Sequence, residues 1–311
     1  EAVQAHVVVD EAPPLRLRAE GQSFEQGVVP HHLRHWRWRG FQIRPRPVGM
    51  EFLEQSLSLD TFDVETFRFQ NIDKTVYSKG AGPGVVILAE MPGIHPLVIR
   101  FAERVAAAGF KVWLPSLFGD DGRAATSAYT IRTLVRTCIR REFKALASHQ
   151  SSPVTDWLRS LAAVVHERCG GPGVGAVGMC FTGNFALNLM LEPAVIAPIL
   201  SQPSLPLTNA SGLHIEPSEL ERIKARLVDE DLTVRAYRFE GDRLCTSARF
   251  EAYQEALGSA FEPRVLPDAS AKQGTGIPPH SVVTHHLVDE RGEPTFEALQ
   301  DMIEFLRLRL A

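Results

Sequence analysis

Four chemically reactive side chains stand where apolar stretches of the chain end. Glu90 closes "GVVILAE", Cys180 closes "VGAVGMC", Asp242 follows "VRAYRFEG", and His280 lies within "GIPPHSVV". A thiolate can attack a carbonyl carbon, an imidazole can accept the proton of the thiol, and a carboxylate can fix the tautomer of that imidazole. These residue types therefore predict nucleophilic catalysis, with Cys180 as nucleophile, His280 as base and Asp242 as the acid that orients the base.

The residues around Cys180 are those expected of a tight turn between a strand and a helix. Gly178 and Gly183 flank the cysteine, and small neighbours allow the helix to pass close to the strand. Thr182 stands where the usual G-x-S-x-G spacing would place glycine. Free backbone N–H groups at the helix start would stabilise a thiolate. The alternative is that Cys180 is an ordinary buried cysteine, the commonest fate of a free thiol.

Other residues of the same types compete for these roles. Asp268 in "LPDAS" is the rival of Asp242. His285 and His286 are the rivals of His280, although their place on the following strand or turn favours a structural role. The remaining cysteines, Cys138, Cys169 and Cys245, are expected to be buried and structural. Only Cys245 is near enough in sequence to Asp242 to approach the site.

The segments between these residues alternate between strand and helix patterns. Strands are predicted at 66–70, 74–80, 84–90, 110–119, 174–180, 194–201, 232–241 and 262–268. Helices are predicted at 97–109, 127–149, 153–171, 181–191, 216–231, 246–258 and 294–310. This alternation predicts an α/β fold, with a mostly parallel central sheet, helices on both faces and an antiparallel hairpin in front. The order nucleophile, acid, histidine is typical of the α/β-hydrolase architecture.

The composition sets the broad class of protein. The 311 residues are 44% hydrophobic and 23% charged, with a formal net charge of -4, so they predict a soluble globular protein without a general attraction for nucleic acid. The apolar runs are shorter than the roughly 20 residues that a bilayer requires. Four cysteines without zinc-ligand spacing and the lack of a signal peptide favour a reducing, cytoplasmic location.

Residues 1–49 differ in composition from the rest of the chain. They contain arginine but no lysine, many prolines, and no sustained helix or strand period, so we expect a poorly ordered N-terminal extension. An alternative is that "HHLRHWRWR" is a basic aromatic patch for RNA or anionic lipid. Residues 50–311 are expected to form the catalytic domain.

Four segments together resemble the dienelactone hydrolase family: "ILAEMPGIHP", "GMCFTGNFAL", "FEGDRLC" and "PPHSVVT". The resemblance implies an α/β-hydrolase fold that hydrolyses carboxylic esters or lactones through Cys180, His280 and Asp242, without metal or organic cofactor. It implies that Glu90 acts on the resting thiol. It also implies an oxyanion hole made of the Met91 and Phe181 N–H groups, and a monomer or weak homodimer that takes a small-molecule substrate and no membrane or nucleic-acid partner.

The sequence departs from the family at the substrate carboxylate. Thr284, in "HSVVTHH", stands where the family has an arginine after the catalytic histidine, so a small anionic dienelactone is a doubtful substrate. Arg140 or Arg141 could replace that arginine, although "RTCIRREFK" also fits a solvated helix face. His95 and Ser281 are further candidates for substrate contacts.

Two other functions remain open from the sequence. A thioesterase or acyltransferase would use the same fold and nucleophile, because the acceptor is chosen by the shape of the pocket. A non-catalytic protein could bind a ligand or sense oxidants through Cys180.

Overall fold

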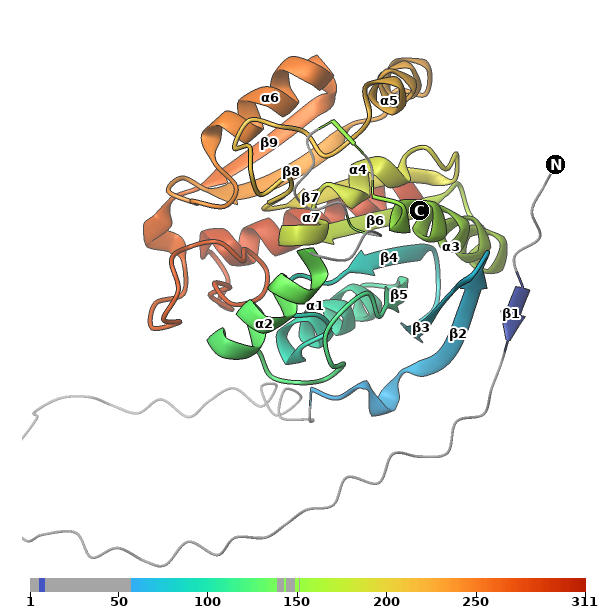
Figure 1. Cartoon of the computed structure of the whole chain (residues 1–311), viewed down its shortest axis with the longest axis horizontal. Helices are drawn as coiled ribbons and strands as arrows, with labels where there is room; N and C mark the ends of the chain where they lie inside the picture. Colours follow the sequence, from blue (N-terminus) through green and yellow to red (C-terminus); the bar gives the residue numbers. More distant parts are fainter. Residues whose placement is uncertain (1–5, 9–56, 139–142, 144–148, 151) are drawn as a thin grey trace, which may run out of the picture. The chain divides into compact units, whose positions relative to one another are not determined.

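The computed structural model describes residues 6–8, 57–138, 143, 149–150 and 152–311 (Figure 1). The chain divides into a unit made of residues 1–9 and 57–311 and a second unit made of residues 10–56. The second unit lies outside the described residues, as do most of the predicted extension and both Arg140 and Arg141.

The described part of the chain is built on a nine-stranded sheet with the order β1-β2-β3-β5-β4-β6-β7-β8-β9. The strands are β1 (His6–Val8), β2 (Asp63–Phe69), β3 (Ile72–Lys79), β4 (Gly84–Leu88), β5 (Lys111–Pro115), β6 (Val174–Met179), β7 (Val195–Ser201), β8 (Val234–Phe239) and β9 (Phe261–Leu266). The first strands, up to the β3–β5 pair, are antiparallel, whereas the pairs from β5 through β4 to β9 are parallel. The predicted α/β fold with a mostly parallel sheet is confirmed.

Helices cover both faces of this sheet (Figure 1). They are α1 (Pro96–Ala107), α2 (Ser127–Cys138), α3 (Val154–Cys169), α4 (Phe185–Leu189), α5 (Pro217–Asp229), α6 (Ser247–Leu257) and α7 (Pro294–Leu310). On one face α1 and α7 pack through residues such as Phe101 and Met302, and on the other α3 and α4 pack through Trp157 and Phe185. None of the described helices is both long and apolar enough to cross a membrane.

The adjacent strands β4 and β6 place two candidate residues at the same edge of the sheet. Both strands are buried along their whole length, which explains their continuous apolar sequences. Their parallel register pairs Leu88 with Gly178. Glu90 and Cys180 each lie two residues beyond this pair, at the carboxyl ends where α/β sheets bind ligands.

Most predicted elements agree with the structure. The helix predicted at 127–149 is assigned only over α2, and most of its later residues lie outside the described part of the chain. The helix predicted at 181–191 is reduced to α4, and a 3-10 turn, Cys180–Thr182, precedes it. The chain turns back sharply after β6, and this turn uses the residues that a longer helix would need. Residues 6–8, within the predicted extension, pair as β1 with β2.

Candidate active site

Cys180 is the first residue after β6, and its backbone has a positive φ of 53°. A residue with a side chain rarely adopts this conformation, which costs free energy and persists only where the surroundings enforce it. The following 3-10 turn and α4 then carry the chain away from the sheet. The thiol is thereby held at the tip of a sharp strand-to-helix turn.

The two flanking glycines are required because backbone lies against them. A Cβ atom on Gly178 would come within 2.3 Å of the Thr182 carbonyl oxygen. One on Gly183 would come within 2.5 Å of the Pro203 Cα atom. Both distances are far below van der Waals contact, so a larger residue at either position would open the turn and displace Cys180.

Thr182 uses its hydroxyl to join this turn to the neighbouring strand. The hydroxyl is fully buried, accepts a hydrogen bond from the Met179 N–H at 3.1 Å and donates to the Leu88 carbonyl oxygen at 2.9 Å. The residue that departs from the usual glycine therefore ties the end of β4 to the end of β6.

Asp242 and His280 form a hydrogen-bonded pair beside the turn. The His280 Nδ1 lies 2.7 Å from Oδ2 of Asp242. The other carboxylate oxygen, Oδ1, accepts the backbone N–H groups of Leu244 and Cys245, each at 2.9 Å. The carboxylate is buried and held on both sides, so it fixes Nδ1 of the imidazole as the donor and leaves Nε2 to face the cavity.

The rival acid and one rival histidine have structural contacts instead. Asp268 accepts the Gly241 N–H at 2.8 Å, next to Asp242 in the chain. The His286 Nδ1 accepts the backbone N–H groups of His280 at 3.2 Å and Ser281 at 3.1 Å. His286 therefore shapes the loop that presents His280.

His280 and Cys180 line the same cavity. Burial opposes a charge on the imidazole, but the negative charges that Cys180 and Asp242 can carry outweigh it and raise the pKa of His280 well above its ordinary value. In the resting geometry Nε2 is buried and makes no hydrogen bond to a described residue, while the Cys180 sulfur accepts the Ser204 hydroxyl at 3.5 Å. The interaction with Cys180 that raises the pKa of His280 nevertheless indicates that the imidazole and the thiol lie close together.

The Glu90 carboxylate is enclosed by polar side chains. Oε2 accepts the Ser281 hydroxyl at 2.7 Å and the Gln202 amide at 3.2 Å, and Oε1 accepts the Thr284 hydroxyl and lies 3.3 Å from His95 Nε2. Burial alone would raise the pKa of this carboxyl, but contact with His95, followed by the weaker effects of His285 and Thr284, lowers the pKa to about 2. None of these contacts of Glu90 is with Cys180, on which the family resemblance implied that it acts. The lowered pKa keeps the Glu90 carboxylate charged.

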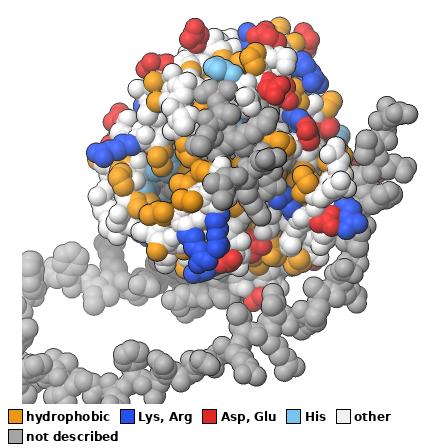
Figure 2. Space-filling view, in the orientation of Figure 1, with side chains coloured by type: hydrophobic (Ala, Val, Ile, Leu, Met, Phe, Trp, Pro, Cys, Tyr) orange, Lys and Arg blue, Asp and Glu red, His pale blue; other side chains and the backbone are white. Residues whose placement is uncertain are grey.

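The cavity over Cys180 has a volume of about 580 Å³. Met91 and Phe181, whose N–H groups are the predicted oxyanion donors, line it together with the cysteine. Its outer wall is mostly apolar and includes Ile131, Leu134, Leu207, Leu244 and Ile277. Figure 2 shows hydrophobic side chains gathered on part of the face drawn there. The Phe181 ring points away from the chemistry, into a cluster with Phe118, Phe143 and Phe185.

Arg243 is a pocket residue that sequence reasoning missed. It is exposed and follows Asp242 directly, and it is the only arginine or lysine among the described residues that line the cavity. Its position in the chain, next to the predicted acid, was the available signal. Of the predicted substrate-contacting residues, Ser281 lines the cavity, whereas His95 is buried against Glu90.

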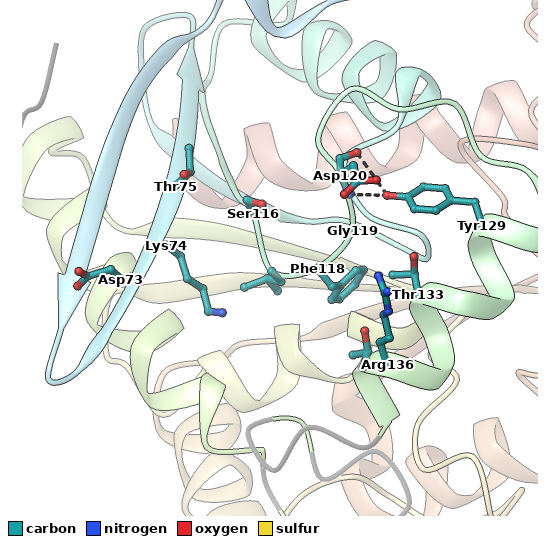
Figure 3. Close-up of a pocket in the computed structure, with 12 residues that line it drawn as sticks. Asp73, Lys74, Thr75, Ser116, Phe118, Gly119, Asp120, Tyr129, Thr133 and Arg136 are labelled. Atoms are coloured by element: carbon teal, nitrogen blue, oxygen red, sulfur yellow. Dashed lines mark hydrogen bonds between the residues drawn. The ribbon is translucent and has the colours of Figure 1, made fainter. Parts of the chain in front are cut away.

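A second cavity, of about 610 Å³, lies between β3 and α2 (Figure 3). Its walls carry Lys74 on β3, Phe118 and Asp120 on the loop after β5, and Arg136 on α2. Although it is slightly larger, no cysteine or histidine is among the described residues that line it. The predicted nucleophile, acid and base line the cavity over Cys180 instead.

A cysteine on a strand-to-helix turn, beside a histidine and an aspartate in a mostly parallel sheet, defines a protein of the α/β-hydrolase class. Within this class, residues 73–225, just under half of the chain, match the model of the dienelactone hydrolase family, so this segment is similar to that family. The matched segment contains Glu90 and Cys180, while Asp242 and His280 lie beyond it.

Individual proteins agree with this placement. A Saccharomyces cerevisiae protein named "Putative carboxymethylenebutenolidase" is 26% identical over 179 residues, which are 55% of this chain and 64% of the relative, less than two thirds of its length. The dienelactone hydrolase of Anabaena variabilis has a TM-score of 0.52 at 16% identity, covering 80% of this chain and 98% of the other. A dienelactone hydrolase-like promiscuous phosphotriesterase from metagenomic libraries has a TM-score of 0.54 at 14% identity, covering 81% and 100%. The last two share the fold.

Proposed function

We propose that the protein hydrolyses carboxylic esters or lactones through an acyl-enzyme on Cys180. The observation that carries the proposal is the Asp242–His280 hydrogen bond of 2.7 Å beside a cysteine held at positive φ. A buried carboxylate that fixes the imidazole, together with a thiol on a strained turn, is the arrangement that nucleophilic acyl transfer requires.

In the first half of the reaction His280 Nε2 takes the proton of the Cys180 thiol, and the thiolate attacks the carbonyl carbon. The carbonyl π electrons move to oxygen, and the Met91 and Phe181 N–H groups stabilise that oxyanion. When the oxyanion collapses, the alkoxide leaves with the proton from His280, and a thioester to Cys180 remains. A lactone follows the same course, with the alkoxide still attached to the acyl group.

In the second half a water molecule replaces the alcohol. His280 takes a proton from the water as its oxygen attacks the thioester, and the second tetrahedral intermediate expels the Cys180 thiolate. His280 returns the proton to the sulfur, which restores the resting site. Asp242 stays ionised throughout and stabilises the imidazolium that forms twice in each cycle.

The walls of the cavity indicate the substrate class. Apolar side chains favour an acyl or alcohol group with a hydrophobic body. The Thr284 hydroxyl donates to Glu90, so this position supplies no positive charge for a substrate carboxylate. We propose an uncharged ester or lactone as the preferred substrate, with Arg243 able to receive an anionic group at the mouth.

The test is the turnover of a neutral aryl ester by Cys180→Ala, with Cys169→Ala as the matched control on α3. We expect Cys180→Ala to lose at least about 10³-fold in kcat/KM and Cys169→Ala to lose almost nothing. Mass spectrometry of the wild-type protein quenched during turnover is expected to find the acyl group on the peptide that contains Cys180. Full activity of Cys180→Ala would overturn the proposal. A panel of lactones, esters and thioesters would then rank hydrolase against thioesterase.

A further inference from the structure

A second group of reactive side chains lies beside the thiol. Glu90 follows β4, His95 precedes α1, and His285 belongs to the loop that carries His280. Each offers a ligand atom, and these atoms all lie within 4.8 Å of one another. The two imidazole rings are 5.0 Å apart between centroids and inclined by 34°. The fold thus brings His285 to Glu90 and His95, which lie close together in the loop between β4 and α1.

The distance between the two buried donors fits coordination to one ion. His95 Nε2 lies 3.3 Å from Glu90 Oε1. Zinc binds imidazole nitrogen and carboxylate oxygen at about 2.0–2.2 Å, so two ligands at a tetrahedral zinc are roughly 3.3–3.5 Å apart. This pair already has the required separation, and His285, which is only partly buried, is the ligand that must approach.

His95 Nε2 is also a buried atom that makes no hydrogen bond to a described residue. The side chain is almost fully buried, and Nε2 faces Oε1 of Glu90 at 3.3 Å. A buried polar atom in this state is costly unless another partner binds it. A metal ion between the nitrogen and the carboxylate would be such a partner.

The other lone pairs of Glu90 are held by surrounding side chains. The Ser281 hydroxyl and the Gln202 amide fix Oε2, and the Thr284 hydroxyl donates to Oε1. Carboxylate ligands in metal sites are oriented by hydrogen bonds of this kind. The carboxylate is therefore already positioned for a ligand role.

We propose that Glu90, His95 and His285 form a binding site for a divalent transition-metal ion of the zinc type. Two imidazoles and one carboxylate are a ligand set that zinc uses where it keeps one position open. Glu90 and His285 line the cavity over Cys180, so the open position faces the same space as the thiol. The ion would join the loop of His280 to the end of β4. This site departs from the sequence-based expectation of a protein without metal.

The test measures binding on the full chain, without turnover, so its result does not depend on whether Cys180 is the nucleophile. The protein is stripped with a chelator, and Cys180→Ser serves as background to remove the nearby thiol. Zn²⁺ is then titrated in competition with a chromophoric indicator, and Co²⁺ is added separately to record its visible spectrum. We expect one ion per chain, and a Co²⁺ spectrum of low coordination number without sulfur charge-transfer bands.

Two variants locate the ion, and a third is their matched control. His95→Gln and His285→Gln are each expected to weaken Zn²⁺ binding by at least tenfold, while His166→Gln on α3 leaves it unchanged. If the buried His95→Gln fails to fold, the partly buried His285→Gln still provides the comparison. No binding, or unchanged binding in His285→Gln, would overturn the site. Binding that disappears with Cys180→Ser would do so too, because the ion would then be held by the thiol.

Discussion

Asp242 holds His280 by one carboxylate oxygen while the backbone N–H groups of Leu244 and Cys245 hold the other. The imidazole contact is 2.7 Å, and the two backbone contacts are each 2.9 Å. The aspartate is fixed by its own loop, so the orientation of the imidazole is determined before any substrate arrives.

Replacing Asp242 by Asn is expected to leave the shape of the site intact and to impair its chemistry. An amide can present its NH₂ group to His280 Nδ1, which moves the ring proton to Nε2 and removes the base. We expect kcat/KM for a neutral ester to fall by about 10³- to 10⁴-fold. Asp268→Asn is the control, since that carboxylate accepts the Gly241 N–H, and this substitution should lower kcat/KM by less than about tenfold. Equal losses in the two variants would contradict the assignment of Asp242.

The pH dependence of stability follows from the raised pKa of His280. The folded chain holds this proton more tightly than the unfolded chain, so the resulting stabilisation is fully present below the ordinary histidine pKa of about 6.5. It is lost as the pH rises through the pKa of the folded state. Asp242→Asn removes one of the charges that raise this pKa. The free energy of unfolding of the wild type should therefore exceed that of Asp242→Asn by more near pH 6 than in alkaline solution. Urea unfolding of both proteins across a pH series measures this difference, and a difference that does not change with pH would contradict the prediction.

Thr182→Val tests the hydroxyl that joins the two strand ends. Valine keeps the shape of the side chain but leaves the Met179 N–H and the Leu88 carbonyl without this partner. Burying such groups unpaired is expected to lower the free energy of unfolding by about 1–3 kcal/mol. Because the turn carries Cys180, kcat should fall as well. Thr182→Ser retains the hydroxyl and should remain much closer to wild type in both measurements, made by urea unfolding and by ester turnover.

Arg243→Gln should affect anionic and neutral ester substrates differently. The exposed guanidinium at the mouth should aid an ester that carries a carboxylate and have no effect on its neutral methyl ester. An exposed charge contact is worth little, so we expect kcat/KM for the anionic ester to fall by about two- to fivefold, more at low salt. The neutral ester should be unaffected. A matching loss with both esters would assign Arg243 to packing and not to charge.

Much of this architecture could be predicted because it depends on local sequence. Buried strands such as β4 and β6 have continuous apolar runs. Cys180 and Asp242 stand where such runs end or shortly after, and His280 lies in the Gly- and Pro-rich loop that follows the last strand. The contacts that support them could not be predicted in the same way. The bond from Thr182 to Leu88 and the enclosure of Glu90 by Thr284 and Gln202 join residues that only the folded sheet brings together.

The positions of two residues, His286 and Arg243, could not be predicted from their residue types. His286 accepts the N–H groups of His280 and Ser281, yet in the sequence it is simply one of several neighbouring histidines. Arg243 was hidden because its contact with the cavity depends on the direction of the loop after β8. The sequence indicates which type of residue a role needs. Only the path of the folded chain decides which of several residues of that type has the role.

The packing of α7 on β6, the strand that precedes Cys180, has a consequence for protein synthesis. Leu306 of α7 is fully buried, and a Cβ atom on Gly175 of β6 would come within 2.5 Å of its side chain. A nascent chain exposes β6 and Cys180 to solvent before the ribosome has made Asp242, His280 or this helix. During that interval the thiol lacks the two residues that we propose act with it, and β6 lacks the packing that α7 supplies. The proposed reaction on Cys180 therefore depends on residues that are synthesised well after the turn that carries the thiol.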